Sequence, residues 1–457
     1  MDSLPLAEIA AMSGSKLLNG GRGITVSTVN KDTRTIRPGD LYIALRGENF
    51  DGNAFAADAL AKGAAAVLLD SPAEAEKLAA THPVLLAEDG LAALTSLASA
   101  WRARLTLKVL AITGSTGKTS VKEFAAAVLA TRFRVVKTEG NLNNHIGVPL
   151  SILAAKTTDQ VAVWEIGMNH PGEIAPLAEL AKPHCAIITN IGTAHIEHLK
   201  SREAIAREKG ALAEAVPADG TVILCADDDM SGSIAARCQA KVLLAGLTRG
   251  ELTADSITPT PTGTDFNIHT PGKDALHPAT IPVQGRHMVQ NALLAVAAGI
   301  ELGVPLSAAI KGLSRARLAE GRLEQKNIRG VIYLDDSYNA NPDSMEAALD
   351  TLHSMPGSGR RIAVLGKMGE LGDYGPEGCR RTGNAAARLA DILVTVGTEA
   401  RPIAEAARAS GLNRIHEVEN TAAAARMLDQ LARPGDVVLI KGSRSARMET
   451  IFPNLDN

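Results

Sequence analysis

Short apolar runs, each followed by a glycine or polar loop and then by an amphipathic stretch, recur through the middle of the chain. From Leu107 onwards these runs are KVLAIT, RVVKT, VAVWEIG, CAIITNIG and TVILCA. A short apolar run bounded by turn residues is typical of a buried strand, and the stretches between the runs have helical periodicity. The alternation predicts βαβ units, and therefore a mainly parallel sheet covered by helices.

The segments on either side have related patterns. The first hundred or so residues contain short β-like runs, notably TVNKDTRTIRPGDLYIALRG, then an alanine-rich helical stretch and the strand-like AAAVLLD. Towards the C-terminus, VIYLDD, RIAVLG, DILVTVG and DVVLIKG predict a second α/β series. Between them, residues 247–282 are rich in Thr, Pro and Gly, which predicts hairpins inserted before the helix MVQNALLAVAAGIELG.

The length of 457 residues exceeds what one hydrophobic core usually organises. The changes of pattern predict an α/β protein of three domains, at residues 1–106, 107–313 and 314–457. The first is a small α/β domain, the second has a parallel sheet, and the third is Rossmann-like. Apolar residues make up 46% of the chain and charged residues 21%, which is typical of a globular protein.

The remaining bulk properties exclude several kinds of partner. The formal net charge is -3, so no nucleic-acid or membrane-surface partner is expected. The four cysteines form no CxxC pair, which disfavours a disulfide framework and a structural zinc and fits a reducing cytosol. No apolar run is long enough to cross a bilayer, and MDSLPLAEIAAMSG lacks a signal-peptide pattern. We expect a cytoplasmic, unprocessed monomer without membrane insertion.

The sharpest local signal is the strand, turn and helix of KVLAITGSTGKTSVKEFAAAVLA. Backbone N–H groups of such a turn and the positive end of the following helix favour phosphate, Lys118 adds a charge, and the Thr119 hydroxyl can reach magnesium. The common pattern GxxxxGK[ST] would have glycine at Ile112, so this loop is a variant. The alternative is a strand-to-helix turn with incidental glycines. The predicted phosphate-binding residues are Gly114, Ser115, Thr116, Gly117, Lys118, Thr119 and Ser120.

Three further polar residues follow in the same series. Glu165 ends the strand VAVWEIG, where a carboxylate can ligate magnesium. His195 follows CAIITNIG at the carboxyl edge of the predicted sheet, where open α/β proteins place ligands. Lys209 lies in the predicted helix SREAIAREKGALAEAV, whose N-cap is Ser201. Taken singly, each has a plainer explanation: a solvated carboxylate, a structural histidine and an exposed lysine.

Together, TGSTGKTS, EIGMN, NIGTAH and EKG resemble, in order and spacing, the central domain of the Mur ligases, which are ATP-dependent amino-acid ligases of peptidoglycan synthesis. The resemblance implies that Thr119 and Glu165 hold one Mg²⁺, and that His195 and a carbamylated Lys209 help to hold a second. The CO₂ adduct of lysine would supply the carboxylate-like oxygens that magnesium prefers. The catalytic residues implied are Lys118, Glu165, His195, Lys209 and Arg322.

The same resemblance extends to the rest of the ATP site. GRHMVQNALLA supplies Asn291 for the adenine, AEGRLE supplies Arg322 for the phosphates, and DDSYNANP supplies Asp336 for the nucleotide. An arginine donated by a mobile third domain would complete the site on closure. Met288 stands where the family usually has asparagine. The plainer alternatives are a surface ion pair for Arg322 and a turn-stabilising role for Asp336.

Both ends of the chain resemble the family member that adds D-alanyl-D-alanine. DDSYNANP, LGKMGELG and DVVLIKGSRSARME carry this resemblance, and the DNPR sequence of the diaminopimelate-adding relative is absent. Lys367 and Asn53 depart from the family pattern, and the GKMGELG loop could be an ordinary glycine-rich loop.

Candidates for the dipeptide are Asn339, Asn341, Ser443 and Arg444. Candidates for the uridine nucleotide are Asp32, Thr33, Arg34 and Arg46. Candidates for its pyrophosphate and sugar are Thr138, Asn141, Asn143 and Asn144, although clustered asparagines also form turns.

The resemblance thus implies an N-terminal uridine-nucleotide domain, a central P-loop ATPase domain and a C-terminal dipeptide domain. The expected reaction joins D-alanyl-D-alanine to UDP-N-acetylmuramoyl-tripeptide through an acyl phosphate, with ATP and Mg²⁺. Alternatives within the class are another Mur ligase or a folylpolyglutamate synthase. An alternative from another class is a nucleotide-dependent switch or scaffold.

Overall fold

The computed structural model spans residues 1–457 and describes all of them except residues 20, 22, 48, 271–275 and 456–457. The chain groups into two compact units. The first contains Met1–Ala111, Phe133–Met168 and Ala175–Pro183. The second contains Ile112–Arg132, Asn169–Ile174 and His184–Asn457. The boundaries of the three predicted domains stay predictions.

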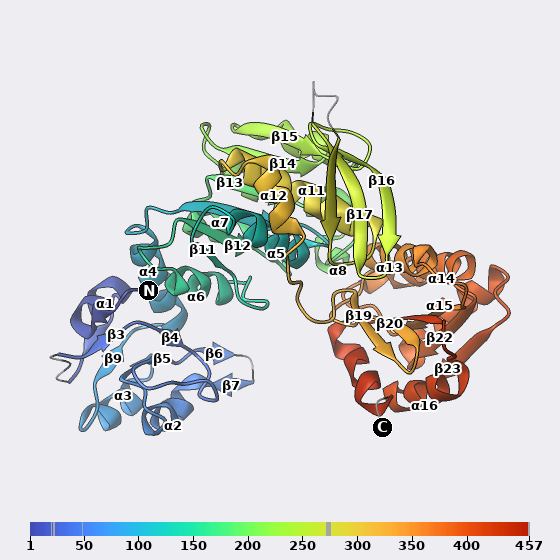
Figure 1. Ribbon diagram of the computed structural model, residues 1–457. Coiled ribbons are helices and arrows are strands. Elements are labelled where there is room, and N and C mark those ends of the chain that lie inside the picture. The colour runs from blue at the N-terminus through green and yellow to red at the C-terminus, as the bar shows by residue number, and fades with distance from the viewer. Residues whose placement is uncertain (20, 22, 48, 271–275, 456–457) are drawn as a thin grey trace. The chain divides into compact units, whose positions relative to one another are not determined.

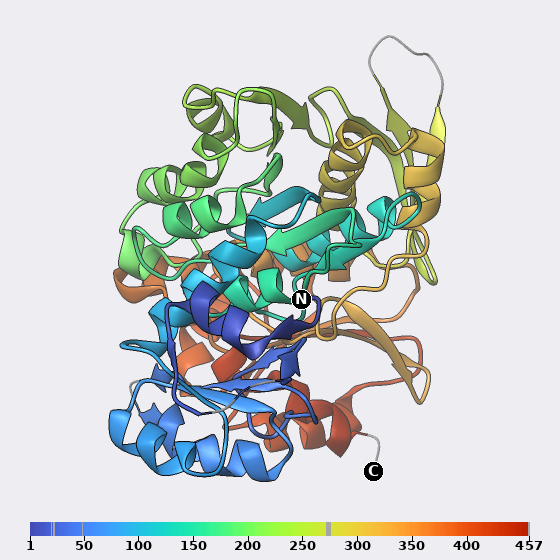
Figure 2. The same ribbon diagram turned by 90° about the vertical axis from the view of Figure 1, so that its left-hand side faces the viewer.

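The first unit begins with the small α/β module that the sequence predicts, shown in blue in Figure 2. Its five-stranded sheet has the order β2-β9-β8-β5-β4. The strands are β2 (Lys16–Leu17), β9 (Val84–Leu86), β8 (Ala66–Leu69), β5 (Leu41–Ile43) and β4 (Val29–Asn30). Tyr42, Val67 and Leu69 pack in its core with alanines of helices α2 (Ala56–Ala61) and α3 (Pro72–Ala79). The run AAAVLLD is therefore strand β8, as predicted.

The rest of the first unit contains two predicted strands, β11 (Val135–Lys137) and β12 (Val161–Glu165), which pair in parallel. They precede β10 (Lys108–Thr113) in the sheet order β11-β12-β10. Helices α4 (Gly90–Arg102) and α6 (Gly147–Ala154) pack against one another.

In the second unit the sheet continues from the carboxyl end of β10 in the order β10-β13-β14-β15. The three later strands are parallel: β13 (Cys185–Ile188), β14 (Thr221–Cys225) and β15 (Lys241–Ala245). The helices that matter for the site are α5 (Lys118–Leu129), α8 (Ile196–Leu199), α9 (Arg202–Glu214) and α11 (Arg286–Glu301). Ser201 caps α9 as predicted, because its hydroxyl accepts a hydrogen bond from the Ala204 N–H at 3.2 Å.

Three antiparallel strands form a separate sheet in the predicted hairpin region (Figure 1). They are β16 (Thr253–Thr260), β17 (Gly263–His269) and β18 (His277–Ile281). Helix α11 follows as predicted, although it begins at Arg286, two residues before the predicted start.

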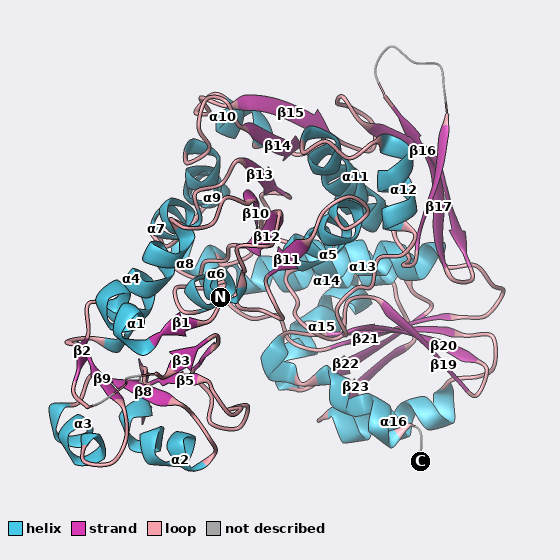
Figure 3. Ribbon diagram, turned by 60° about the vertical axis from the view of Figure 1, so that its left-hand side comes forward, coloured by secondary structure: helices cyan, strands magenta, loops and turns pink. Residues whose placement is uncertain are grey.

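The C-terminal sheet has the order β19-β20-β24-β21-β22-β23. Figure 3 shows it with α13 (Pro342–Ser354) and α14 (Gly375–Leu389) on one face and α16 (Thr421–Leu431) on the other. The four predicted strands are β20 (Val331–Asp336), β24 (Val437–Lys441), β21 (Arg361–Leu365) and β22 (Ile392–Val396). Two more strands, β19 (Glu324–Ile328) and β23 (Ile415–Val418), were not predicted. The prediction of an α/β fold is confirmed.

Asp436 anchors the start of β24. Its carboxylate accepts hydrogen bonds from the Arg360 and Arg433 backbone N–H groups, both at 2.9 Å, and from the Arg360 guanidinium at 2.5 Å. Burial raises the pKa of this carboxyl, but the hydrogen bonds outweigh burial and hold the pKa below its usual value.

We expect Asp436→Ala to lower the free energy of unfolding by about 2 kcal/mol at pH 7, because buried donors lose their acceptor. The exposed Asp429, paired with Arg329, is the control, and Asp429→Ala should change stability by less than about 0.5 kcal/mol. Because the folded pKa of Asp436 is depressed, its contribution is complete above about pH 4 and is lost as the pH falls further. Denaturant melts at pH 7 and pH 3 measure both differences. An Asp436→Ala effect that grows in acid would contradict this explanation.

None of the helices in the described part of the chain is long and apolar enough to cross a membrane.

Candidate functional site

The predicted phosphate loop connects strand β10 to helix α5. Gly114 and Gly117 have φ values of 151° and 79°, which L side chains rarely adopt. The loop is also tightly enclosed: a Cβ on Gly114 would lie 1.8 Å from the Thr189 Oγ1 atom, and a Cβ on Gly117 would lie 2.6 Å from the Asn291 Oδ1 atom. Only glycine therefore fits at these two positions, and the alternative of incidental glycines is not supported.

Two residues after strand β13 hold this loop from one side. The Asn190 Oδ1 atom accepts from the Thr116 N–H at 2.9 Å, and the Asn190 Nδ2 atom donates to the Thr116 hydroxyl at 2.6 Å. The Thr189 hydroxyl donates to the Thr116 carbonyl at 2.5 Å. Lys118 Nζ donates to the Gly114 carbonyl at 2.7 Å, so the lysine lies across its own loop. Sequence reasoning missed Thr189 and Asn190, although both stand in the quoted run CAIITNIG.

We expect Gly114→Ala to weaken ADP binding at least about tenfold, or about 1.4 kcal/mol, because the methyl group must displace Thr189 and reshape the loop. The control is Gly232→Ala in helix α10 (Ser231–Ala235), where a Cβ meets nothing within 4 Å. That change should leave ADP binding unaltered. Isothermal titration with ADP tests both, and an unchanged affinity in Gly114→Ala would contradict the role of the loop.

Lys209 is completely buried in helix α9, contrary to the plain alternative of an exposed lysine. Its Nζ atom has no hydrogen-bond partner among the described residues. Burial and the nearby positive charge of Lys118 lower its pKa well below the usual value. Burial and the lowered pKa favour the uncharged amine, which is the form of lysine that reacts with CO₂.

His195 lies at the N-terminus of the short helix α8, beyond the carboxyl end of β13 as predicted. Its Nδ1 atom is 2.5 Å from the Glu370 Oε2 atom, an ion-pair distance, although the N–H is not aligned as in a straight hydrogen bond. Burial is the largest influence on the pKa of His195, and with the nearby Lys118 and Lys209 it lowers that pKa below its usual value, although Glu370 acts in the opposite direction. The imidazole is therefore neutral near pH 7, as a metal-binding histidine must be.

Arg322 reaches the phosphate loop from the segment that leads to the C-terminal sheet. Its guanidinium lies 3.4 Å from the Thr119 hydroxyl and stacks on the Tyr338 ring, with Cζ 4.1 Å from the ring centroid. Its Nε atom is buried without a hydrogen-bond partner in the described structure. The alternative of a surface ion pair is thus not supported, and the arginine is oriented by an aromatic face.

The other ATP-site candidates lie in the same unit. Asn291 packs on Gly117, and its Nδ2 atom contacts the sulfur of Met288 at 3.7 Å. Asp336 ends β20, and its carboxylate accepts a hydrogen bond from the buried Lys441 ammonium at 2.5 Å. Lys441 also donates to the Asn339 carbonyl at 2.9 Å. Lys441, which sequence reasoning did not single out, therefore fixes both Asp336 and the loop after it.

Glu165 and the asparagine loop belong to the first unit. The Asn143 Nδ2 atom donates to the Glu165 Oε1 atom at 2.7 Å, and the Thr138 hydroxyl accepts from the Glu165 N–H at 3.1 Å. Asn144 accepts from the Gly147 N–H at 2.9 Å, so this asparagine forms the turn before α6, as the alternative reading allowed. Asn141 is exposed. The shared metal of Glu165 and Thr119 stays a prediction.

The substrate candidates have varied surroundings. Asn341 is the N-cap of α13 and accepts from the Ser344 N–H at 2.9 Å, so its side-chain oxygen already has a structural role. Asn339 and Arg444 are exposed, and Ser443 is buried. The Lys367 side chain pairs with Glu399 at 2.8 Å.

In the N-terminal module, Arg34 pairs with Asp32 at 2.6 Å and Arg46 pairs with Asp70 at 3.0 Å. The Arg34 hydrogen bond lowers the pKa of Asp32 to about 2. Thr33 is half-buried. Asn53, which departs from the family pattern, is buried and donates to the Asp70 carboxylate at 2.7 Å, beneath Arg46.

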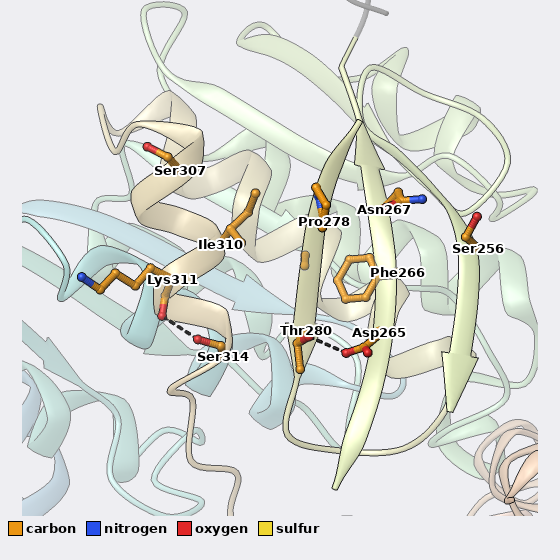
Figure 4. Close-up of a pocket in the computed structure, with 11 residues that line it drawn as sticks. Ser256, Asp265, Phe266, Asn267, Pro278, Thr280, Ser307, Ile310, Lys311 and Ser314 are labelled. Atoms are coloured by element: carbon orange, nitrogen blue, oxygen red, sulfur yellow. Dashed lines mark hydrogen bonds between the residues drawn. The ribbon is translucent and has the colours of Figure 1, made fainter. Parts of the chain in front are cut away.

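Two surface cavities lie around the β16–β18 sheet. One, of about 430 Å³, is lined by Phe266, Pro278 and Ile310 beside helix α12 (Leu306–Leu313), and none of the site candidates lines it (Figure 4). The other, of about 460 Å³, includes Arg322 and the buried Gln284 in its wall. The described residues contain no group of three or more His, Cys, Asp or Glu side chains placed to hold a metal. Magnesium often takes much of its shell from phosphates and water, so the donors named above still fit it.

Comparisons with known proteins agree with this arrangement. Three family models match in order: "Mur ligase family, catalytic domain" at residues 25–102, "Mur ligase middle domain" at 112–299 and "Mur ligase, glutamate ligase domain" at 321–444. The UDP-N-acetylmuramoyl-tripeptide--D-alanyl-D-alanine ligase of Bacillus subtilis is 37% identical over 93% of this chain and 92% of its own length. The chain belongs to the Mur ligase family.

Solved structures narrow the resemblance within that family. The crystal structure of MurF from Acinetobacter baumannii covers 100% of this chain and 99% of its own, with a TM-score of 0.88 and 32% identity. MurF from Thermotoga maritima, solved in complex with ADP, has a TM-score of 0.82 and 26% identity over 94% of this chain and 97% of its own. The particular proteins that this chain resembles along its whole length are thus the D-alanyl-D-alanine-adding ligases.

Proposed function

We propose that this protein is an ATP-dependent ligase that joins D-alanyl-D-alanine to UDP-N-acetylmuramoyl-tripeptide in peptidoglycan synthesis. The single observation that carries the proposal is the full-length similarity to ligases of that name. The phosphate loop, the buried Lys209 and the Arg322 contact with Thr119 supply the chemistry that such a reaction needs. Because the substrate and ATP are cytoplasmic compounds, we place the reaction in the cytoplasm.

In the first step a carboxylate oxygen of the tripeptide attacks the γ-phosphorus of ATP, giving an acyl phosphate and ADP. In the second, the amine of D-alanyl-D-alanine attacks the acyl carbon, loses a proton and displaces phosphate. Lys118 and Arg322 neutralise charge as two anions approach, which would otherwise cost several kcal/mol even at an effective dielectric of about 20. The loop amides hold the nucleotide in place.

Magnesium fits the donors of the second unit. Thr119 offers a hydroxyl at the phosphate loop, and His195 offers an imidazole near the buried Lys209 amine, which would ligate as its carbamate. Glu165 as a further ligand of the Thr119 ion stays a prediction from the family resemblance. Bound there, the ions would supply further positive charge at the phosphates. The unpartnered Lys209 Nζ atom favours this reading, since an amine that stays buried without a partner is costly.

Phosphate release is the direct test, with ATP, UDP-N-acetylmuramoyl-tripeptide and D-alanyl-D-alanine each omitted in turn. We expect release only with all three. A panel of single amino acids and folate separates the other Mur ligases and folylpolyglutamate synthase. A switch or scaffold would bind ATP yet show no dependence on the dipeptide, and that result would refute the proposal.

A further inference from the structure

Two carboxylates of the C-terminal segment contact one loop beside the phosphate site. We call residues 191–199 the His195 loop. The Asp343 Oδ2 atom accepts from both the N–H and the hydroxyl of Thr193, at 2.6 and 2.8 Å. Glu370 lies 2.5 Å from His195 Nδ1, and its carbonyl accepts from the Glu197 N–H at 3.3 Å. The loop is thus held on both sides of His195.

The fit at these contacts is close. A Cβ on Gly192 would lie 2.3 Å from the Asp343 Oδ2 atom, and a Cβ on Gly372 would lie 2.9 Å from the Glu197 Cγ atom. Gly192 belongs to the His195 loop, and Gly372 belongs to the segment after Glu370. Each glycine lets a side chain of the other segment come closer than a Cβ atom would allow.

Asp343 is itself firmly positioned. It lies in the first turn of α13, whose N-cap is Asn341. Its Oδ1 atom pairs with Arg381 at 3.0 Å, and Arg381 also pairs with Glu346 at 2.7 Å. These two carboxylates raise the pKa of Arg381, so the guanidinium stays charged. Asp343 thus presents its other oxygen to Thr193 from a rigid support.

His195 and Glu370 both have left-handed backbone conformations, with φ values of 64° and 58°. Residues other than glycine keep such conformations only where their surroundings impose them, and these residues cluster at functional sites. Here the two unusual residues contact each other across 175 positions of sequence. The pair therefore has a geometry that local sequence preferences do not explain.

We propose that Asp343 and Glu370 are positioning residues for His195. Glu370 favours the proton on Nδ1 and leaves Nε2 unprotonated for a metal ion, while Asp343 fixes the loop two residues earlier. A metal-binding histidine commonly donates its other ring N–H to a carboxylate, and losing that partner typically weakens metal binding about 10- to 100-fold. The inference rests on the proposed function in taking His195 as a Mg²⁺ ligand.

These contacts couple the orientation of His195 to the docking of the C-terminal segment. Both carboxylates lie in segments that carry the resemblance to the D-alanyl-D-alanine-adding ligases: Asp343 follows the dipeptide candidate Asn341 by two positions, and Glu370 belongs to the LGKMGELG loop. His195 is therefore oriented only while the C-terminal segment is docked on its loop. Metal binding at His195 and docking of that segment should support each other.

The test uses the full-length protein with ADP and Mn²⁺, whose binding is followed by electron paramagnetic resonance. Glu370→Gln removes the charge at nearly constant size, and Glu370→Gly removes the side chain while suiting the left-handed backbone. Both should weaken one class of Mn²⁺ sites about tenfold or more. Glu377→Gln is the matched control, because Glu377 pairs only with Arg380 in the described structure and its side chain is 40% exposed on α14. It should bind Mn²⁺ as the unaltered protein does.

A second readout does not depend on metal or activity. Nitrogen-15 spectra of the histidine rings report which nitrogen is protonated, with His195 assigned by its loss in His195→Gln. We expect the Nδ1–H form, replaced in Glu370→Gly by a mixture of the two forms. If both Glu370 variants keep the original Mn²⁺ affinity and ring tautomer, the positioning role is refuted. If phosphate release fails in the unaltered protein, the proposed function falls, and the tautomer result still decides the positioning role.

Discussion

Replacement of Lys118 by alanine should lower kcat for phosphate release by about 10³-fold, the effect expected when a charge that stabilises a developing anion is removed. The structure places this ammonium on the Gly114 carbonyl of the phosphate loop, so it is already at the position where phosphate would bind. Lys118→Arg should also be impaired, because a planar guanidinium does not replace a point charge in a tight loop. Steady-state kinetics measure both changes.

The matched control is Lys108→Ala, at the exposed first residue of β10. It removes the same kind of side chain from the strand that leads into the loop and should keep kcat within about twofold, since Lys108 lies outside the loop. Circular dichroism melts should show that all three variants are folded. Full activity in Lys118→Ala would mean that the triphosphate binds elsewhere.

Replacement of Lys209 by alanine should lower kcat by about 10²- to 10³-fold, and short carboxylates such as acetate should restore part of the loss. The reason is the burial of the Lys209 amine without a partner among the described residues. A lowered pKa raises the uncharged fraction of the amine, and only the uncharged amine adds CO₂. Carbamate formation then converts a repelled cation into an oxygen ligand.

The comparison for this variant is Lys77→Ala, a lysine on the exposed surface of helix α3 whose side chain is 72% exposed. It should keep full activity with and without acetate. Carbon-13 spectra after incubation with labelled CO₂ give an independent readout: a carbamate signal should be present in the unaltered protein and absent in Lys209→Ala. An active Lys209→Ala protein that gains nothing from acetate would remove the metal role of this lysine.

The parts of the structure that sequence could predict are those whose cause is local. The strand, turn and helix pattern around Lys118 predicted the phosphate loop, and Ser201 before an amphipathic stretch predicted the N-cap of α9. The three unpredicted strands of the two large sheets, β15, β19 and β23, all stand at sheet edges. Edge strands are partly solvated, as the alternating exposure of β19 shows, and β19 (EQKNI) and β23 (IHEV) therefore lack a continuous apolar run. This reason does not apply to β15, whose sequence KVLLA is apolar.

The unpredicted parts of the site depend on contacts between distant segments. Asp343 meets Thr193 across 150 positions, and no local pattern encodes that approach. The burial of Lys209 was also hidden, since a lysine in a helix usually faces water. Asn291 and Arg322 could be named only through the family resemblance, and the structure places both against the phosphate loop.

The stacking of Arg322 on Tyr338 couples the binding of the nucleotide to the binding of D-alanyl-D-alanine. Tyr338 precedes Asn339 in the loop proposed to hold the dipeptide, while the arginine that it supports reaches the nucleotide loop. Any factor by which bound nucleotide alters dipeptide affinity must equal the factor by which dipeptide alters nucleotide affinity. Substituting Tyr338 by leucine should bring that shared factor towards one, whichever ligand is titrated first.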